Sequence, residues 1–171
     1  MTKKLWVLCA CSGSGKSTYV KELQKTYPDL VVASADHYFM KTGQYVFKPE
    51  FLRYAHSESQ WTAQVGMSRG LPVAIDNTNT KFADMSSYLR LAGIYGYEVN
   101  FVIFIVPKEK IPVLVERNVH SVPENVIVRQ WNNLEEMRKS LRRNMKTAYP
   151  ELKYTITEIP LQEGSVTDDK I

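Results

Sequence analysis

The sequence has little cysteine and no long apolar segment, and each shortage excludes a class of protein. Its two cysteines, Cys9 and Cys11, are separated by a single residue. They are too close in the chain to join distant parts of a fold, so we expect no disulfide framework and a reducing, cytoplasmic location. The longest apolar run covers residues 101–107, whereas a membrane-spanning helix needs roughly 20 residues. We therefore expect no membrane partner.

The composition that remains is that of a globular protein with a small basic surplus. Hydrophobic residues make up 44% of the 171 residues, and the formal net charge is +4. Such a surplus favours a polyanionic partner such as nucleic acid. We see no internal repeat, linker or low-complexity tract, so we expect one domain over residues 1–171, with a frayed tail at about 163–171.

Short apolar segments alternate with helical patterns along the chain. Apolar residues spaced three and four apart predict a helix after each of the first three segments, and a last long helix from about residue 123 to 148. This alternation predicts an α/β fold of the P-loop NTPase or kinase type, with a central parallel sheet of about four to five strands and helices on both faces. The segments that predict strands are 5–10, 30–36, 72–76, 98–106 and 153–160.

The segment LWVLCACSGSGKSTYV, residues 5–20, fits two interpretations. After the basic start of the chain it resembles an export signal, with Cys11 as a lipid-attachment residue. It also fits a buried strand that leads into a phosphate-binding loop. We favour the loop, because cleavage of a signal would remove the first strand of a regular alternating pattern.

A phosphate-loop motif, ACSGSGKS, runs from Ala10 to Ser17, with Ala10 in place of the first glycine. Glycines let successive backbone N–H groups converge on phosphates at the start of a helix. Lys16 would reach the β- and γ-phosphates of ATP or another NTP, and Ser17 would hold Mg²⁺. The residues predicted to bind the nucleotide are Ser12, Gly13, Ser14, Gly15, Lys16, Ser17 and Thr18.

Two aspartates follow apolar runs at predicted strand ends, where ligands of open α/β sheets bind. We favour Asp36 as a general base that takes a proton from an acceptor hydroxyl. Asp76 begins the polar segment Asp76-Asn77-Thr78-Asn79, which could hold metal-bound waters or the acceptor. The alternative for this segment is a helix cap followed by a turn.

Basic residues cluster after the fourth predicted strand. Phosphoryl transfer commonly uses a movable arginine, and we choose Arg117 for this role within a lid at about residues 110–130. His120 is interpreted as a surface histidine of the lid turn. Further on, Arg138, Arg142 and Arg143 share one face of the predicted long helix. That face either grips a nucleic-acid backbone or is simply solvated.

Four motifs together resemble the P-loop kinases typified by bacteriophage 5′-hydroxyl polynucleotide kinase. They are ACSGSGKST, the SAD of residues 34–36, DNTNT and RNVHSVP, and the resemblance covers about residues 3–135. The resemblance implies ATP-dependent transfer of the γ-phosphate to a hydroxyl on nucleic acid. The acceptor that we favour is the hydroxyl at the 5′ end of a strand. Lys16 and Ser17 would then bind ATP and Mg²⁺, Asp36 would be the base, and Arg117 would belong to the lid.

One departure leaves the acceptor open. Polynucleotide kinases resembling this chain place an arginine three residues after the catalytic aspartate, and here that position is Phe39. A kinase acting on a hydroxymethylated pyrimidine base in phage DNA, such as 5-hydroxymethyluracil, would not need that arginine, and nearby aromatic residues could stack on an extruded base. A small-molecule kinase and a nucleotide-dependent binding module also remain open. The residues assigned to the acceptor are Tyr38, Phe39, Asn77, Thr78, Asn79 and Arg129.

Overall fold

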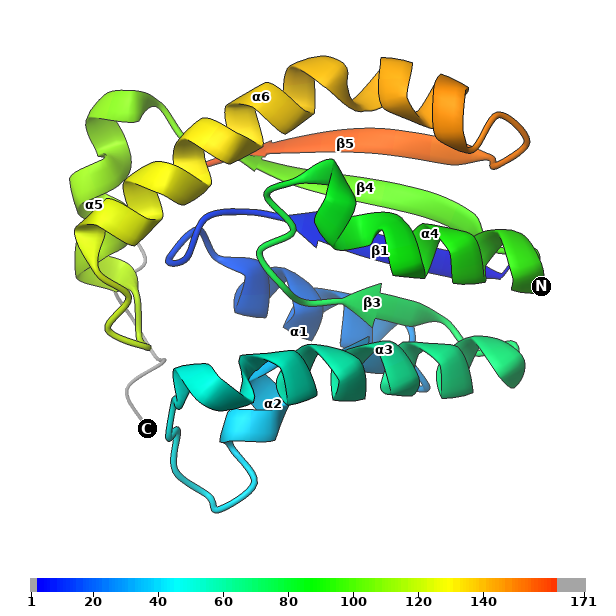
Figure 1. The fold of residues 1–171 in the computed structure, drawn as a ribbon, viewed down its shortest axis with the longest axis horizontal. Helices are drawn as coiled ribbons and strands as arrows, with labels where there is room; N and C mark the ends of the chain where they lie inside the picture. The colour runs from blue at the N-terminus through cyan, green and yellow to red at the C-terminus, as the bar shows by residue number, and fades with distance from the viewer. Residues whose placement is uncertain (1–2, 163–171) are drawn as a thin grey trace.

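Five parallel strands form one central sheet in the computed structural model, which describes residues 3–162 (Figure 1). The strand order is β2-β3-β1-β4-β5, so the predicted α/β fold class is confirmed. The tail expected to fray, 163–171, lies outside the described residues. The strands are β1 (Lys4–Cys9), β2 (Val31–Ala33), β3 (Val73–Ile75), β4 (Glu98–Ile105) and β5 (Tyr154–Pro160).

Helices cover both faces of the sheet, as the sequence predicts. On one face, α1 packs Val20 against Trp6 and Leu8. On the other, α3, α4 and α6 pack their apolar stripes against alternate residues of β1 and β4. The helices are α1 (Lys16–Thr26), α2 (Asp36–Phe39), α3 (Leu52–Ser68), α4 (Phe82–Tyr95), α5 (Ile111–Arg117) and α6 (Glu124–Ala148), with 3-10 turns η1 (Pro49–Phe51) and η2 (Lys108–Lys110).

The parallel register brings the loops that matter to one edge of the sheet. Leu5 of β1 pairs with Val73 of β3 and Val99 of β4, and β3 lies between β1 and β2. Because all strands run the same way, the loops after β1, β3 and β2 leave the sheet side by side. This edge carries the phosphate-loop motif and both aspartates.

Two details differ from the sequence prediction. The second strand ends at Ala33 instead of Asp36, and Asp36 begins the unpredicted short helix α2. Ala35 and Phe39 pack on Ala55 of α3, and this packing turns the chain out of the sheet. The long helix begins at Glu124, close to the predicted start. No helix among residues 3–162 is long and apolar enough to cross a membrane.

Candidate active site

The loop between β1 and α1 has the backbone that a phosphate loop requires. Gly13 and Gly15 adopt left-handed φ angles of 82° and 97°, which glycine adopts without steric cost. A Cβ atom at Gly13 would also lie 2.5 Å from the carbonyl oxygen of Leu114, so α5 presses directly on the loop. Glycine is therefore required at position 13 both for its φ angle and for space.

Three hydrogen bonds anchor this loop to the rest of the edge. The Ala10 N–H donates to the Thr78 carbonyl (2.8 Å), and the Asn79 amide donates to the Leu8 carbonyl (2.7 Å). The Ser12 N–H donates to Oε1 of Gln130 on α6 (2.9 Å), a contact that the sequence did not reveal. The loop is thereby held to the segment after β3 and to the first turns of α6.

The segment Asp76–Asn79 has a structural role that differs from the predicted acceptor role. Asn79 is buried, with 3% of its surface exposed, and its amide is committed to β1, so it is unavailable to an acceptor. Thr78 supplies its carbonyl to the phosphate loop. The same buried turn holds Asn79 at a φ of 44°, which asparagine tolerates better than most residues.

Asn77 fixes the beginning of α2 and is also committed within the fold. Its Oδ1 accepts from the Ala35 N–H at 2.8 Å. Its Nδ2 donates to the Ser59 hydroxyl at 3.2 Å and to the Tyr88 hydroxyl at 3.3 Å. Asn77 therefore positions the residue after Ala35, which is Asp36, and the acceptor contact expected of Asn77 stays a prediction.

Asp36 is contacted by two side chains from separate segments. The Tyr45 hydroxyl donates to Oδ1 (3.2 Å), and Nε2 of His120 lies 3.7 Å from Oδ2. The side chain of Asp36 remains 49% exposed, so it is open to a substrate. His120, expected to be a surface histidine of the lid turn, lies in that turn with its side chain 33% exposed and its imidazole facing Asp36.

The lid turn between α5 and α6 is built so that His120 points inward. The Asn118 side chain donates to the carbonyls of Val115 and Val122 (3.1 and 3.2 Å) and accepts from the Val122 N–H (2.7 Å). Ser121 adopts a φ of 54°. Arg117, at the end of α5, donates to the Gln162 carbonyl (3.0 Å).

Asp76 shares an electrostatic environment with the other charged candidates. Burial raises its pKa above the ordinary value, Lys16 acts in the opposite direction, and the Asp36 charge adds to the rise. The imidazoles of His37 and His120 also lower the pKa of Asp76. Charges that act on the pKa of Asp76 lie near it, so Lys16 and Asp36 are neighbours of this carboxyl group.

The loop has unused capacity to bind a ligand. The Ser14 hydroxyl is buried and has no hydrogen-bond partner in the described part of the chain, and a buried polar atom without a partner is costly. Phosphate oxygens would satisfy it. No group of three or more acidic, histidine or cysteine side chains within residues 3–162 could hold a metal alone.

The basic face of α6 is less available than the sequence suggests. Arg138 is held by Glu158 of β5 at 2.7 Å and by Glu135 at 3.4 Å, so these carboxylates would compete with a nucleic-acid backbone for its guanidinium. Arg142 and Arg143 are exposed. Gln130 of α6 contacts the phosphate loop. Arg142 comes 12 residues after Gln130 in the same helix, so it lies roughly 18 Å further along the helix axis. Arg129, assigned to the acceptor, is exposed near the start of α6.

Comparison with known sequences identifies related proteins. The model of a protein family described as an AAA domain matches residues 5–143. NEDD4-binding protein 2 of Homo sapiens is 35% identical over 130 residues, which make up 73% of this chain and 7% of that protein. The chain thus spans a small part of the curated relative that it matches.

Comparison with solved structures supports the same architecture. A chain of the Pnkp1/Rnl/Hen1 RNA repair complex matches with a TM-score of 0.67 and 20% identity, over 81% of this chain and 46% of that one. A structure of AvrRxo1-ORF1:-ORF2 with ATP matches with a TM-score of 0.66 and 15% identity, over 92% and 55%. At these identities the likeness shows the fold.

Proposed function

Because the chain belongs to the AAA domain family, we propose that it is a phosphotransferase that moves the γ-phosphate of ATP to a hydroxyl on nucleic acid. The acceptor that we favour is the 5′-hydroxyl end of a polynucleotide. The observation that carries this proposal is the position of Asp36, half-exposed at the same sheet edge as the phosphate loop and Asp76. A binding module would not need an open carboxylate beside the transferred phosphate. The solved RNA repair complex and the ATP-bound neighbour support the choice of substrates.

The donor side is assigned to the loop after β1. Backbone N–H groups from Gly13 to Ser17, the start of α1 and the Ser14 hydroxyl would bind the ATP phosphates. Lys16 would contact the β- and γ-phosphates. Ser17 and Asp76 would hold Mg²⁺, which neutralises phosphate charge when it is bound.

On the acceptor side, Asp36 takes the proton. As the acceptor oxygen bonds to the γ-phosphorus, the bond from that phosphorus to the bridging oxygen breaks and ADP leaves. The acceptor proton passes to an oxygen of Asp36, with Tyr45 and His120 holding the carboxylate in place. Arg117 is proposed to offset charge on the transferred group when the lid closes.

A second candidate is a kinase that phosphorylates a hydroxymethylated pyrimidine base in phage DNA. The observation in its favour is the cluster of aromatic side chains beside Asp36, including Tyr38, Tyr45 and Phe47. Such rings suit a base removed from its stack.

The deciding experiment offers the protein γ-labelled ATP, Mg²⁺ and two acceptors separately. One is a 5′-hydroxyl oligonucleotide, and the other is end-blocked DNA containing 5-hydroxymethyluracil. Label on the oligonucleotide supports end phosphorylation, and label on the blocked DNA alone supports the second candidate. Label on neither would contradict both. Lys16→Ala serves as the inactive control, because it removes the phosphate-binding cation and leaves the loop glycines intact.

A further inference from the structure

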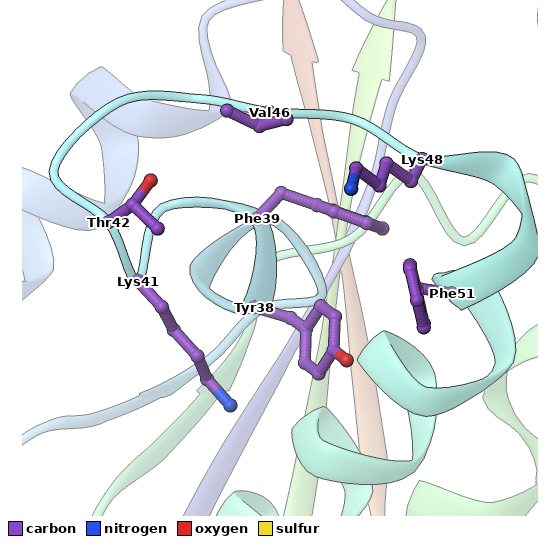
Figure 2. A pocket seen from close by; sticks show the side chains of 7 residues that line it. All are labelled: Tyr38, Phe39, Lys41, Thr42, Val46, Lys48 and Phe51. Atoms are coloured by element: carbon purple, nitrogen blue, oxygen red, sulfur yellow. The ribbon is translucent and has the colours of Figure 1, made fainter.

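A shallow pocket of about 230 Å³ opens beside α2, and no residue of the phosphate loop lines it. Figure 2 shows aromatic rings at its centre and two lysine side chains beside them. The whole lining comes from one segment that begins two residues after Asp36. The lining residues are Tyr38, Phe39, Lys41, Thr42, Val46, Lys48 and Phe51.

Exposed apolar side chains gather around this pocket. Of the nine large apolar side chains that are exposed within residues 3–162, six come from residues 40–54. Isolated exposed apolar residues are normal, whereas a contiguous group commonly marks a binding surface. The six are Met40, Val46, Phe47, Phe51, Leu52 and Tyr54.

Phe39 connects this surface to the proposed base. It is 5% exposed and lines the pocket, so it would meet an acceptor only as part of the pocket wall. Its ring centroid lies 5.4 Å from that of Tyr38 and 6.1 Å from that of Tyr45. Because the Tyr45 hydroxyl binds Asp36, a single aromatic ring separates the pocket wall from the carboxylate.

The charges at the rim suit an anion attached to a flat ring. Lys41 Nζ lies 4.5 Å from the Tyr38 ring centroid and also forms an ion pair with Glu58. Lys48 Nζ lies 5.9 Å from the Phe51 ring centroid, and within the described chain it has no carboxylate partner. Lys48 is therefore the cation at this rim that can offset a phosphate charge.

The lining also distinguishes between classes of acceptor. Its neutral polar side-chain groups are the hydroxyls of Tyr38 and Thr42. A polyol would leave most of its hydroxyls without partners here, and burying them unpaired is unfavourable. A nucleobase instead offers a face for the rings, and its strand offers a phosphate for the lysine.

We propose that this pocket binds a nucleobase of the acceptor strand, close to the hydroxyl that Asp36 deprotonates, with Lys48 against a neighbouring phosphate. The inference rests on the proposed function and specifies how its acceptor is held. Binding depends on ring stacking, so it tolerates any base. The strand leaves Asp36 past Tyr45 and enters the surface formed by residues 38–51.

The test uses 5′-hydroxyl oligonucleotides in which one base at a time, counted from the 5′ end, is replaced by an abasic site. With the wild-type protein, we expect one of the first positions to raise KM for the acceptor by roughly 5- to 150-fold, the range given by loss of one stacked base. Phe51→Ala should raise KM for the intact strand by a similar factor. In that variant, the abasic site should cause no further increase in KM. Lys48→Ala should weaken the dependence of KM on salt.

Matched controls separate this site from general surface effects. Trp61→Ala removes an aromatic side chain that is 64% exposed on α3 but does not line the pocket, and Lys153→Ala removes an exposed lysine before β5. Neither should change KM for the acceptor. Thermal unfolding of each variant confirms that it is folded. The proposal is overturned if no abasic position matters, or if the abasic effect is unchanged in Phe51→Ala.

A separate readout keeps this test apart from the proposed function. If the wild-type protein transfers phosphate to no strand, the proposed kinase activity fails, and the pocket is tested by binding alone. A strand carrying the fluorescent base 2-aminopurine near its 5′ end should then be quenched on binding, and Phe51→Ala should abolish the quenching. Absence of quenching with the wild-type protein overturns the pocket as well.

Discussion

The ring of Tyr45 stacks on the imidazole of His120, with centroids 3.9 Å apart and 26° between the planes. Tyr45 comes from the loop after α2, and His120 comes from the lid turn, so the stack joins two segments that are far apart in the sequence. Both side chains also contact Asp36. The stack therefore links the turn between α5 and α6 to the orientation of the Asp36 carboxylate.

We predict that His120→Ala lowers kcat by roughly 10- to 100-fold, because small displacements of a catalytic group are costly. The Kd for ATP should stay unchanged, since the phosphate loop is untouched. Hydrogen exchange of residues 115–123 should become faster. His56→Ala, an exposed histidine on α3, is the matched control. An unchanged kcat in His120→Ala would show that the contact is incidental.

Asp36→Asn should bind ATP normally but lose transfer by roughly 10²- to 10⁴-fold, the contribution typical of general-base catalysis. The amide keeps the shape of the side chain and can still accept from Tyr45. Single-turnover kinetics with saturating ATP measure the chemical step directly. Normal turnover in this variant would place the base at another residue.

Asp76→Asn should stabilise the ligand-free protein at neutral pH while lowering its activity. Burial raises the pKa of Asp76, so the folded state binds its proton more tightly than the unfolded state. Stability from this group is thus lost as pH rises from the ordinary value of 3.8 through the raised pKa.

Thermal unfolding across that pH range tests this prediction. The melting temperature of the wild-type protein should fall relative to that of Asp76→Asn as pH increases, and the difference should persist at pH 7. Equal curves for the two proteins would mean that the ionised carboxylate costs no stability.

Gly13→Ala should destabilise the fold more than Gly15→Ala. Both positions have left-handed φ angles, which cost an alanine roughly 1–2 kcal/mol. Gly13→Ala adds a clash with the Leu114 carbonyl, whereas nothing lies within 4 Å of a Cβ at Gly15. Urea unfolding of the two variants measures the difference in the free energy of unfolding. Equal losses of stability would show that α5 can shift away from the added methyl group at little cost.

Neutralising Arg142 and Arg143 together tests the exposed part of the α6 face. If this face holds a nucleic-acid backbone, the double glutamine variant should bind a strand more weakly and lower the slope of log K against log salt by up to about 2. A double glutamine variant of Lys21 and Lys25, exposed on α1, is the control. An unchanged slope would show that this face of α6 is exposed to solvent and does not contact the nucleic-acid backbone.

The sheet and its flanking helices could be predicted because their signals are local. Continuous apolar runs such as residues 101–105 and evenly spaced stripes such as that of α6 are visible within a short window. The phosphate loop was predictable for the same reason. The sequence predicts Asp36 at the end of a strand because the apolar run continues past Ala33. The strand ends earlier because Phe39 packs on Ala55 of α3, a contact between distant parts of the chain that no local pattern reveals.

The contacts of the site were less predictable because they depend on distant segments. Tyr45 and His120 are 75 positions apart, and neither belongs to a periodic pattern. Asn77 and Asn79 read as acceptor contacts because polar residues after a strand commonly are. Only the folded turn, which buries Asn79 and brings Asn77 against Ala35, shows that their amides bind the protein itself.

The central position of β1 has a consequence for how the chain folds. Among residues 3–162, β1 pairs only with β3 and β4, so its strand hydrogen bonds cannot form until residues 73–75 and 98–105 have been synthesised. Long sequence separation between pairing strands slows folding. During synthesis, β1 would leave the ribosome well before its partners, and its apolar side chains and unpaired backbone would favour aggregation until β4 is made.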